Sequence, residues 1–153
     1  MADWTVDANI LIYCVDRLEA AKRDVAETVM AAANRDDIAL ARQAIGEFFH
    51  AASRKGKLPP EAAAAVAADY LRGYDTFGAN EADFEVALAE AATGRTQFWD
   101  AVLLAACARS GIMVLLTEDL AQGQHRLGVE IVNPFAPSPA GRKAMKKRGI
   151  SAR

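Results

Sequence analysis

Four carboxylates stand beside apolar segments, where a charged side chain needs a functional or structural reason. They are Asp7, Glu47, Asp100 and Asp119. Asp7 directly follows the short apolar segment 4–6, and Asp119 lies just beyond the strongly apolar segment 112–116. Both segments are candidate strands, and ligands of open parallel sheets bind beyond the carboxyl ends of the strands. The first and last carboxylates are therefore predicted to meet at one edge of a sheet.

The other two carboxylates fall within helical patterns. Asp100 lies in the first turn of an apolar helical segment, residues 98–110, and Glu47 interrupts the apolar start of another. Carboxylates gathered in one buried place raise one another's pKa unless a cation neutralises them. Mg²⁺ and Mn²⁺ prefer such oxygen ligands, and these ions can generate hydroxide from bound water for displacement at phosphorus. The four acids together favour a divalent-metal site.

Simpler roles for each acid stay open. Asp7 could cap the next turn, Asp100 could stabilise a helix N-terminus, and Asp119 could begin a turn. A non-catalytic α/β module that binds a protein partner is therefore an alternative. The sequence has no phosphate-binding glycine loop, no dinucleotide fingerprint and no nucleophile elbow, and its two histidines make a His-rich zinc site improbable. A phosphotransfer domain would need a lysine at a late strand end, and none is present there.

Short apolar segments alternate with helical patterns along the chain. Strands are predicted at 4–6, 38–41, 112–116 and 131–132, and helices at 16–34, 43–55, from 60, at 81–93 and at 98–110. Short, wholly apolar strands separated by helices are typical of a parallel sheet buried between helix layers. We expect an α/β domain in which this sheet positions the acids.

The formal net charge of −2 hides an uneven distribution. Six basic residues and no acidic one lie between Arg142 and Arg153, which leaves 12 basic against 20 acidic residues in the remainder. The overall balance argues against a protein that grips nucleic acid by bulk charge. Together with the prolines and the glycine that precede it, the basic run predicts a mobile tail over residues 136–153, after a domain at 1–135.

The sequence predicts a cytoplasmic protein without a membrane span. No basic stretch precedes an apolar run near Met1, so a signal peptide is not expected. The apolar runs are shorter than the roughly 20 residues of a spanning helix. Cys14 and Cys107 lie in apolar helical stretches, and we expect two buried, reduced thiols.

Four blocks of residues carry a resemblance to a known family. They are Asp7 to Tyr13, Glu47 on its apolar helix, Phe98-Trp99-Asp100-Ala101, and Leu116-Thr117-Glu118-Asp119-Leu120. Over residues 3–135 the sequence resembles PIN-domain ribonucleases and, more closely, the VapC toxins of bacterial toxin–antitoxin pairs. The segment 117–123, followed by 128–135, is particularly similar to that family. The tail after Pro137 has no counterpart in the matched pattern.

The resemblance implies a three-layer α/β/α PIN-like domain with a short, mainly parallel central sheet. It implies a Mg²⁺- or Mn²⁺-dependent endoribonuclease in which a metal-activated water attacks the RNA phosphodiester. It also implies a homodimer and a cognate antitoxin protein that inhibits the enzyme. A solitary nuclease of the same type, without an antitoxin, stays open as an alternative.

The resemblance also implies roles for individual residues. Asp7, Glu47, Asp100 and Asp119 would form the catalytic, metal-binding quartet. Asn9 and Thr117 would support it by hydrogen bonds, and Glu118 is not expected to be a ligand because the family places the acid two residues after the threonine. We further expect His50 at the rim of the pocket or in the core, and Trp99 mainly in the core.

Overall fold

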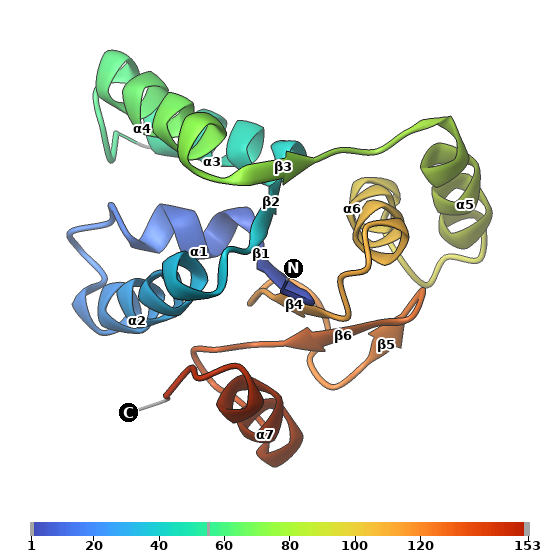
Figure 1. Cartoon of the computed structure of the whole chain (residues 1–153). Helices are drawn as coiled ribbons and strands as arrows, with labels where there is room; N and C mark the ends of the chain where they lie inside the picture. The colour runs from blue at the N-terminus through green and yellow to red at the C-terminus, as the bar shows by residue number, and fades with distance from the viewer. Residues whose placement is uncertain (1, 55, 152–153) are drawn as a thin grey trace.

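The computed structural model describes residues 2–54 and 56–151, which form an α/β fold of seven helices and six strands (Figure 1). The elements in chain order are β1 (Trp4–Val6), α1 (Ala8–Tyr13), α2 (Ala20–Asp36), β2 (Ala39–Ala41), α3 (Arg42–Arg54), α4 (Pro60–Gly73), β3 (Asp75–Phe77), α5 (Glu81–Ala92), α6 (Phe98–Arg109), β4 (Val114–Leu116), β5 (His125–Arg126), β6 (Val129–Val132) and α7 (Pro139–Lys147). None of these helices is both long and apolar enough to cross a bilayer.

The strands form a small, mainly parallel sheet. Its order is β1-β4-β6-β5, in which β1, β4 and β6 run parallel and only β5 is antiparallel. β2 and β3 form a separate parallel pair. β2 contacts β1, and the Thr5 hydroxyl donates a hydrogen bond to the Ala39 carbonyl at 2.7 Å. The chain therefore leaves β1 toward β2 and β3, and later returns to the other side of β1 as β4.

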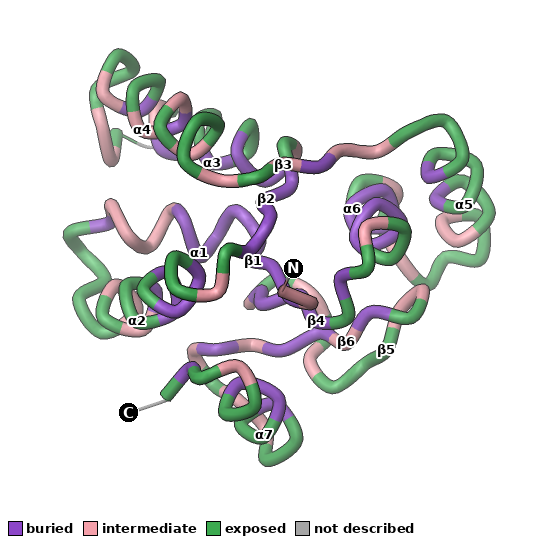
Figure 2. The backbone as a smooth tube through the Cα atoms, in the orientation of Figure 1, coloured by how far each residue is buried: buried purple, intermediate pink, exposed green. Residues whose placement is uncertain are grey.

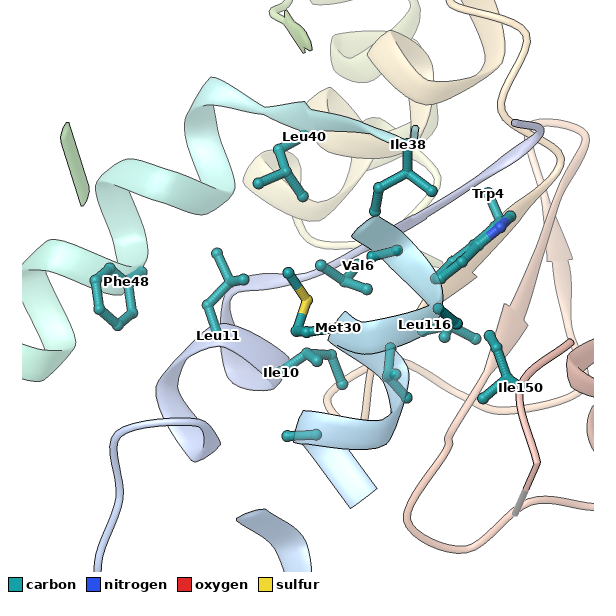
Figure 3. Close-up of a cluster of buried hydrophobic side chains, with 14 of the residues drawn as sticks. Trp4, Val6, Ile10, Leu11, Met30, Ile38, Leu40, Phe48, Leu116 and Ile150 are labelled. Atoms are coloured by element: carbon teal, nitrogen blue, oxygen red, sulfur yellow. The ribbon is translucent and has the colours of Figure 1, made fainter. Parts of the chain in front are cut away.

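Side chains alternate between the two faces of the sheet, as the pleat of a strand requires. Val114 and Leu116 of β4 belong to the larger apolar cluster, whereas Leu115 between them belongs to a second cluster. Figure 3 shows the larger cluster, where Trp4 and Val6 of β1 meet Ile10 of α1, Met30 of α2 and other apolar side chains. The second cluster contains α6. Helices thus cover both faces, an arrangement compatible with three α/β/α layers.

Helix α6 contains a continuous buried run. Every residue from Ala101 to Cys107 is buried, because the sheet lies on one side of α6 and α5 packs on another (Figure 2). The prediction that Trp99 lies mainly in the core is wrong: 60% of its surface is exposed. Its ring packs edge-on against the rings of Phe84 and Phe98.

The predicted helix 16–34 begins later than expected. In the structure α2 begins at Ala20, and Glu19 provides no side-chain cap. Asp16 instead accepts a hydrogen bond from the Leu18 backbone N–H at 3.0 Å and forms an ion pair with Lys57. Asp16 therefore stabilises a turn that leads into the helix.

Residues 136–151 differ from the mobile tail that the sequence predicts. Residues 139–147 form α7, which Ser138 caps by accepting a hydrogen bond from the Gly141 backbone N–H at 3.0 Å. Ala144, Met145 and Ile150 lie in the larger apolar cluster. The core therefore extends past the predicted boundary at residue 135. Met145 and Ile150 supply an apolar side that the many neighbouring lysines and arginines conceal in the sequence. Residues 152 and 153 lie outside the described chain.

The cysteines are both free. Cys107 is buried in α6, as predicted, whereas Cys14 at the end of α1 is only partly buried. Burial raises the pKa of both thiols, that of Cys14 to about 11. Neither thiol is therefore activated as a nucleophile.

Candidate functional site

The site is built where two neighbouring strands end. Asp7 follows β1 and Thr117 follows β4, and the last residues of these strands, Val6 and Leu116, are paired in register. The Asp7 backbone N–H donates to the Leu116 carbonyl at 3.0 Å. The chain leaves β1 toward β2 and later returns to pair β4 with β1, so the two polar residues lie where the direction of chain progression changes. Ligands of open α/β sheets bind at such a topological switch point.

Asp7 and Asp119 are joined by a hydrogen-bond network through Thr117 and Asn9. The Thr117 hydroxyl donates to Asp7 Oδ2 at 2.9 Å and accepts from Asn9 Nδ2 at 2.9 Å. Asn9 Nδ2 also lies 3.1 Å from Asp119 Oδ2, and the Asp119 backbone N–H donates to the Thr117 hydroxyl at 3.2 Å. The other Asp7 oxygen accepts from the Ala8 backbone N–H at 2.7 Å and caps α1. Asp7, Asn9 and Thr117 are buried, whereas Asp119 is exposed. The side chains of Asn9 and Thr117 thus orient both carboxylates.

Glu47 and Asp100 come from two different helices at the same end of the sheet. Glu47 lies on α3, which directly follows β2, and it is exposed because Ala44, Ile45 and Phe48 form the buried side of that helix. Gln43, one turn earlier, donates to Glu47 Oε1 at 3.2 Å and to the Trp99 carbonyl at 3.0 Å. This amide connects α3 to the first turn of α6.

The four carboxylates share one electrostatic field. Burial raises the pKa of Asp7 from 3.8 to about 6, and the negative charges of Glu47 and Asp119 add to this effect. The pKa of Asp100, which is partly buried, is raised by burial and then by the same two charges. In the ion pairs found across the described residues, none of the four acids pairs with a lysine, arginine or histidine. Their charge is therefore uncompensated by the surrounding side chains.

Two clefts meet at Asp119. One, of about 610 Å³, is lined by Asn9, Glu47 and His50 among others, and the second, of about 440 Å³, is lined by Asp100. His50 is exposed on α3, at the rim rather than in the core. Glu47, Asp100 and Asp119 thus line two hollows that share Asp119, whereas the buried Asp7 lines neither of them.

The types of side chain at this site suit a divalent metal ion, but their arrangement does not form a complete metal site. Four carboxylates with amide and hydroxyl support, and no cationic partner, suit a hard divalent cation. However, no group of three or more His, Cys, Asp or Glu side chains in the described part of the chain is arranged to hold one ion. The carboxylates are gathered at one end of the sheet, but they do not form a complete coordination shell.

Glu118, next to Asp119, has a different role. Its carboxylate accepts hydrogen bonds from the Tyr13 hydroxyl and from Lys22 Nζ, the latter at 2.9 Å. The lysine also lies over the Tyr13 ring, 4.8 Å from its centroid. Glu118 is therefore held in a structural ion pair, and the acid available to the clefts is its neighbour.

Gln43 was not identified from the sequence. It precedes Glu47 by four residues, and residues four apart lie on the same side of a helix. That spacing could have identified Gln43 as a neighbour of Glu47, but nothing in the sequence indicated its second contact with Trp99.

No protein-family model matches the chain, and a search of curated proteins found no significant similarity.

Proposed function

We propose that this protein is a metal-dependent endoribonuclease of the PIN type. The observation that carries the proposal is the network that joins Asp7 and Asp119 through Thr117 and Asn9 at the switch point of the sheet. Glu47 and Asp100 contribute further negative charge to the same place. The residues that resemble the family's acidic quartet are therefore neighbours in space, although they are far apart in the sequence.

The quartet of Asp7, Glu47, Asp100 and Asp119 would hold Mg²⁺ or Mn²⁺. A bound divalent ion supplies a water of lowered pKa and stabilises negative charge on the oxygens of the phosphodiester. Asn9 and Thr117 would keep the carboxylates of Asp7 and Asp119 oriented, as they do in the structure. A cation would also favour the ionised form of Asp7, whose pKa is otherwise raised to about 6.

The biological role follows from the same resemblance. We propose that the nuclease is the toxin of a toxin–antitoxin pair, acts on RNA in the cytoplasm as a homodimer and is inhibited by a cognate antitoxin. A solitary nuclease would have the same site without the inhibitor. A small gene with a DNA-binding N-terminus immediately upstream would support the toxin role, and its absence would favour the solitary nuclease.

The direct test is RNA cleavage by the purified chain with Mg²⁺ or Mn²⁺ and, separately, with EDTA. We expect cleavage only with the metal, and no detectable cleavage by Asp7→Asn. Asp69→Asn is a suitable control because it makes the same chemical change on the exposed surface of α4. Metal-dependent cleavage that persists in Asp7→Asn would overturn the assignment. A wild-type chain that neither cleaves RNA nor binds Mn²⁺ would favour the non-catalytic module.

A further inference from the structure

Two arginines share a cleft with two of the acids. Arg95 and Arg126 line the 440 Å³ hollow that also contains Asp100 and Asp119. Arg95 lies in the turn between α5 and α6, and Arg126 lies on β5. A guanidinium group from each of two segments that are distant in sequence is thus brought to the edge of the candidate site.

A single carboxylate positions both arginines. Glu90 of α5 lies 3.5 Å from Arg95 (Oε2 to Nη2) and 3.7 Å from Arg126 (Oε1 to Nη1). The Glu90 side chain is only 13% exposed, and its Oε1 also accepts a hydrogen bond from the Thr96 hydroxyl at 3.2 Å. This one carboxylate therefore forms an ion pair with both cations.

Each arginine has a second anchor. Arg126 Nε donates to Gln124 Oε1 at 2.7 Å, and Arg95 Nε donates to Thr93 Oγ1 at 3.1 Å. Each guanidinium has five N–H donors, and these contacts use only some of them. The pair can therefore bind an anion without giving up its supports.

The charge arrangement is unusual for a cleft that contains carboxylates. Arg95 and Arg126 carry two positive charges against the single charge of Glu90, yet neither forms an ion pair with Asp100 or Asp119 across the described residues. Glu90 pairs with both cations, and the two acids of the cleft have no ion-pair partner among the described residues. The cleft therefore contains two guanidinium groups that could bind an anion as well as two carboxylates.

We propose that Arg95 and Arg126, positioned by Glu90, bind a phosphate group of single-stranded RNA next to the one that is cleaved. The proposal rests on the proposed function and identifies a substrate contact for it. Guanidinium groups bind phosphate oxygens through paired N–H donors. Trp99 adjoins Asp100 and has a largely exposed ring, which suits stacking of an unpaired base. The arginine pair and the exposed Trp99 ring together favour binding of single-stranded RNA over binding of an RNA duplex.

The sharpest test is Glu90→Gln, because general electrostatics and the proposal predict opposite results. Removal of a negative charge should tighten RNA binding if only net charge matters. If Glu90 positions the arginines, the same change should weaken binding. The probe is a fluorescent single-stranded oligouridylate of about 12 nucleotides, with anisotropy measured in EDTA so that cleavage does not interfere. We expect Glu90→Gln, Arg95→Ala and Arg126→Ala each to weaken binding about 3- to 10-fold.

The salt dependence supplies a second readout. Loss of one phosphate contact should lower the slope of log Kobs against log salt concentration by about 0.7 in Arg126→Ala. Matched controls are Asp69→Asn and Arg72→Ala, which break an exposed ion pair of 2.7 Å on α4. If Glu90→Gln lowers the melting temperature strongly, its RNA affinity no longer tests the site, and the RNA affinity of Arg95→Ala is used in its place. The Arg95 side chain is 62% exposed, so its removal leaves the core intact.

Three results would overturn the phosphate site: unchanged binding in both arginine variants, equal or tighter binding by a folded Glu90→Gln, or preferential binding of an RNA duplex of the same length. A wild-type chain that does not bind the oligouridylate would overturn it as well. Cleavage with Mg²⁺, measured on the same preparations, separates this site from the proposed function. Metal-dependent cleavage with unaffected arginine variants contradicts only the phosphate site, whereas absent cleavage by the wild type contradicts the nuclease itself.

Discussion

Helix α7 and the acidic cleft both collect charges of one sign, but they hold those charges in different ways. The acidic cleft is the site around Asp7, Glu47, Asp100 and Asp119. At the cleft, Asp7 is buried and its neighbours add negative charge. On α7, four cations point to solvent around a buried apolar side. They are Arg142, Lys143, Lys146 and Lys147, and none of them takes part in an ion pair within the described chain. Uncompensated charge is thus buried in one region and solvated in the other.

The energetic consequence differs by about an order of magnitude. A pKa raised from 3.8 to about 6 corresponds to roughly 3 kcal/mol against the ionised form of Asp7. A like-charge pair four residues apart on an exposed helix costs only about 0.2–0.5 kcal/mol. The acidic cleft, rather than the basic helix, therefore stores the free energy that a bound ligand could release.

The largest expected effect is on catalysis at the cleft. Asp119→Asn should lower metal-dependent RNA cleavage at least about 100-fold, since changes to residues that only support metal ligands already cost 10- to 100-fold. The exposed position of Asp119 should keep the fold intact. The matched variant on α7, Lys146→Gln, should retain cleavage within about 3-fold at moderate salt. Equal losses in the two variants would remove the functional distinction between the regions.

The second effect concerns the apolar side of α7. Met145→Ala should lower the free energy of unfolding by about 2–4 kcal/mol, because the Met145 side chain is only 2% exposed in the larger cluster. Urea unfolding followed by circular dichroism measures the change. A loss below about 0.5 kcal/mol would show that α7 is not packed and would restore the mobile tail that the sequence predicts.

The third effect is a gain of stability at the cleft. The pKa of Asp7 in the folded protein lies above its ordinary value, so the folded state binds the proton more tightly than the unfolded chain. Stability contributed by this group is present below about pH 4 and decreases as the pH rises to about 6. Asp7→Asn lacks this penalty and should be about 1–2 kcal/mol more stable than the wild type at pH 7 without metal, after allowance for a weakened bond to Thr117.

Thermal melts of the two proteins between pH 4 and pH 8 test the third effect. The difference in melting temperature should grow through this range and level off above about pH 7. A difference that is independent of pH, or a variant that is less stable than the wild type at pH 7, would contradict the buried ionisable carboxylate. Added Mn²⁺ should narrow the difference by stabilising only the wild type.

The smallest effect is expected for the charges of α7. Lys143→Gln combined with Lys147→Gln removes a like-charge pair four residues apart and should change the free energy of unfolding by less than about 0.5 kcal/mol. The direction should be stabilising at low salt and vanish at high salt, because exposed charges are screened. A loss above 1 kcal/mol in urea unfolding would indicate partners for these lysines.

The sequence predicted the parts of the fold that depend on local patterns. Short apolar segments were sufficient to predict the strands β1, β2, β4 and β6, and the apolar helical pattern was sufficient to predict α6. Elements that are buried between layers must be almost wholly apolar, so their composition identifies them. β3 and α1 were missed, since three residues with an exposed Asp75 and a six-residue helix give too little periodicity. α7 was missed because its basic residues outnumber the apolar ones that pack.

The same distinction applies to the site. The position of Asp7 after a strand and of Asp100 in a first helical turn could be predicted from the sequence alone. The hydrogen bond from Asn9 to Thr117 and the hydrogen bond from Gln43 to the Trp99 carbonyl could not be predicted, because they depend on how distant segments meet in space. Glu90 could not be predicted as the partner of two arginines for the same reason. The exposure of Trp99 was mispredicted because its apolar sequence context resembles a core position.

Calorimetric titration with Mn²⁺ of the wild type, Asp7→Asn and Asp119→Asn measures directly whether the acidic cleft binds a divalent metal. We expect saturable binding to the wild type, release of protons near pH 6 as Asp7 ionises, and binding at least about 10-fold weaker in each variant. Asp69→Asn should bind as the wild type does. Absence of Mn²⁺ binding by the folded wild type, or equal binding by all four proteins, would contradict the metal site and with it the proposed nuclease.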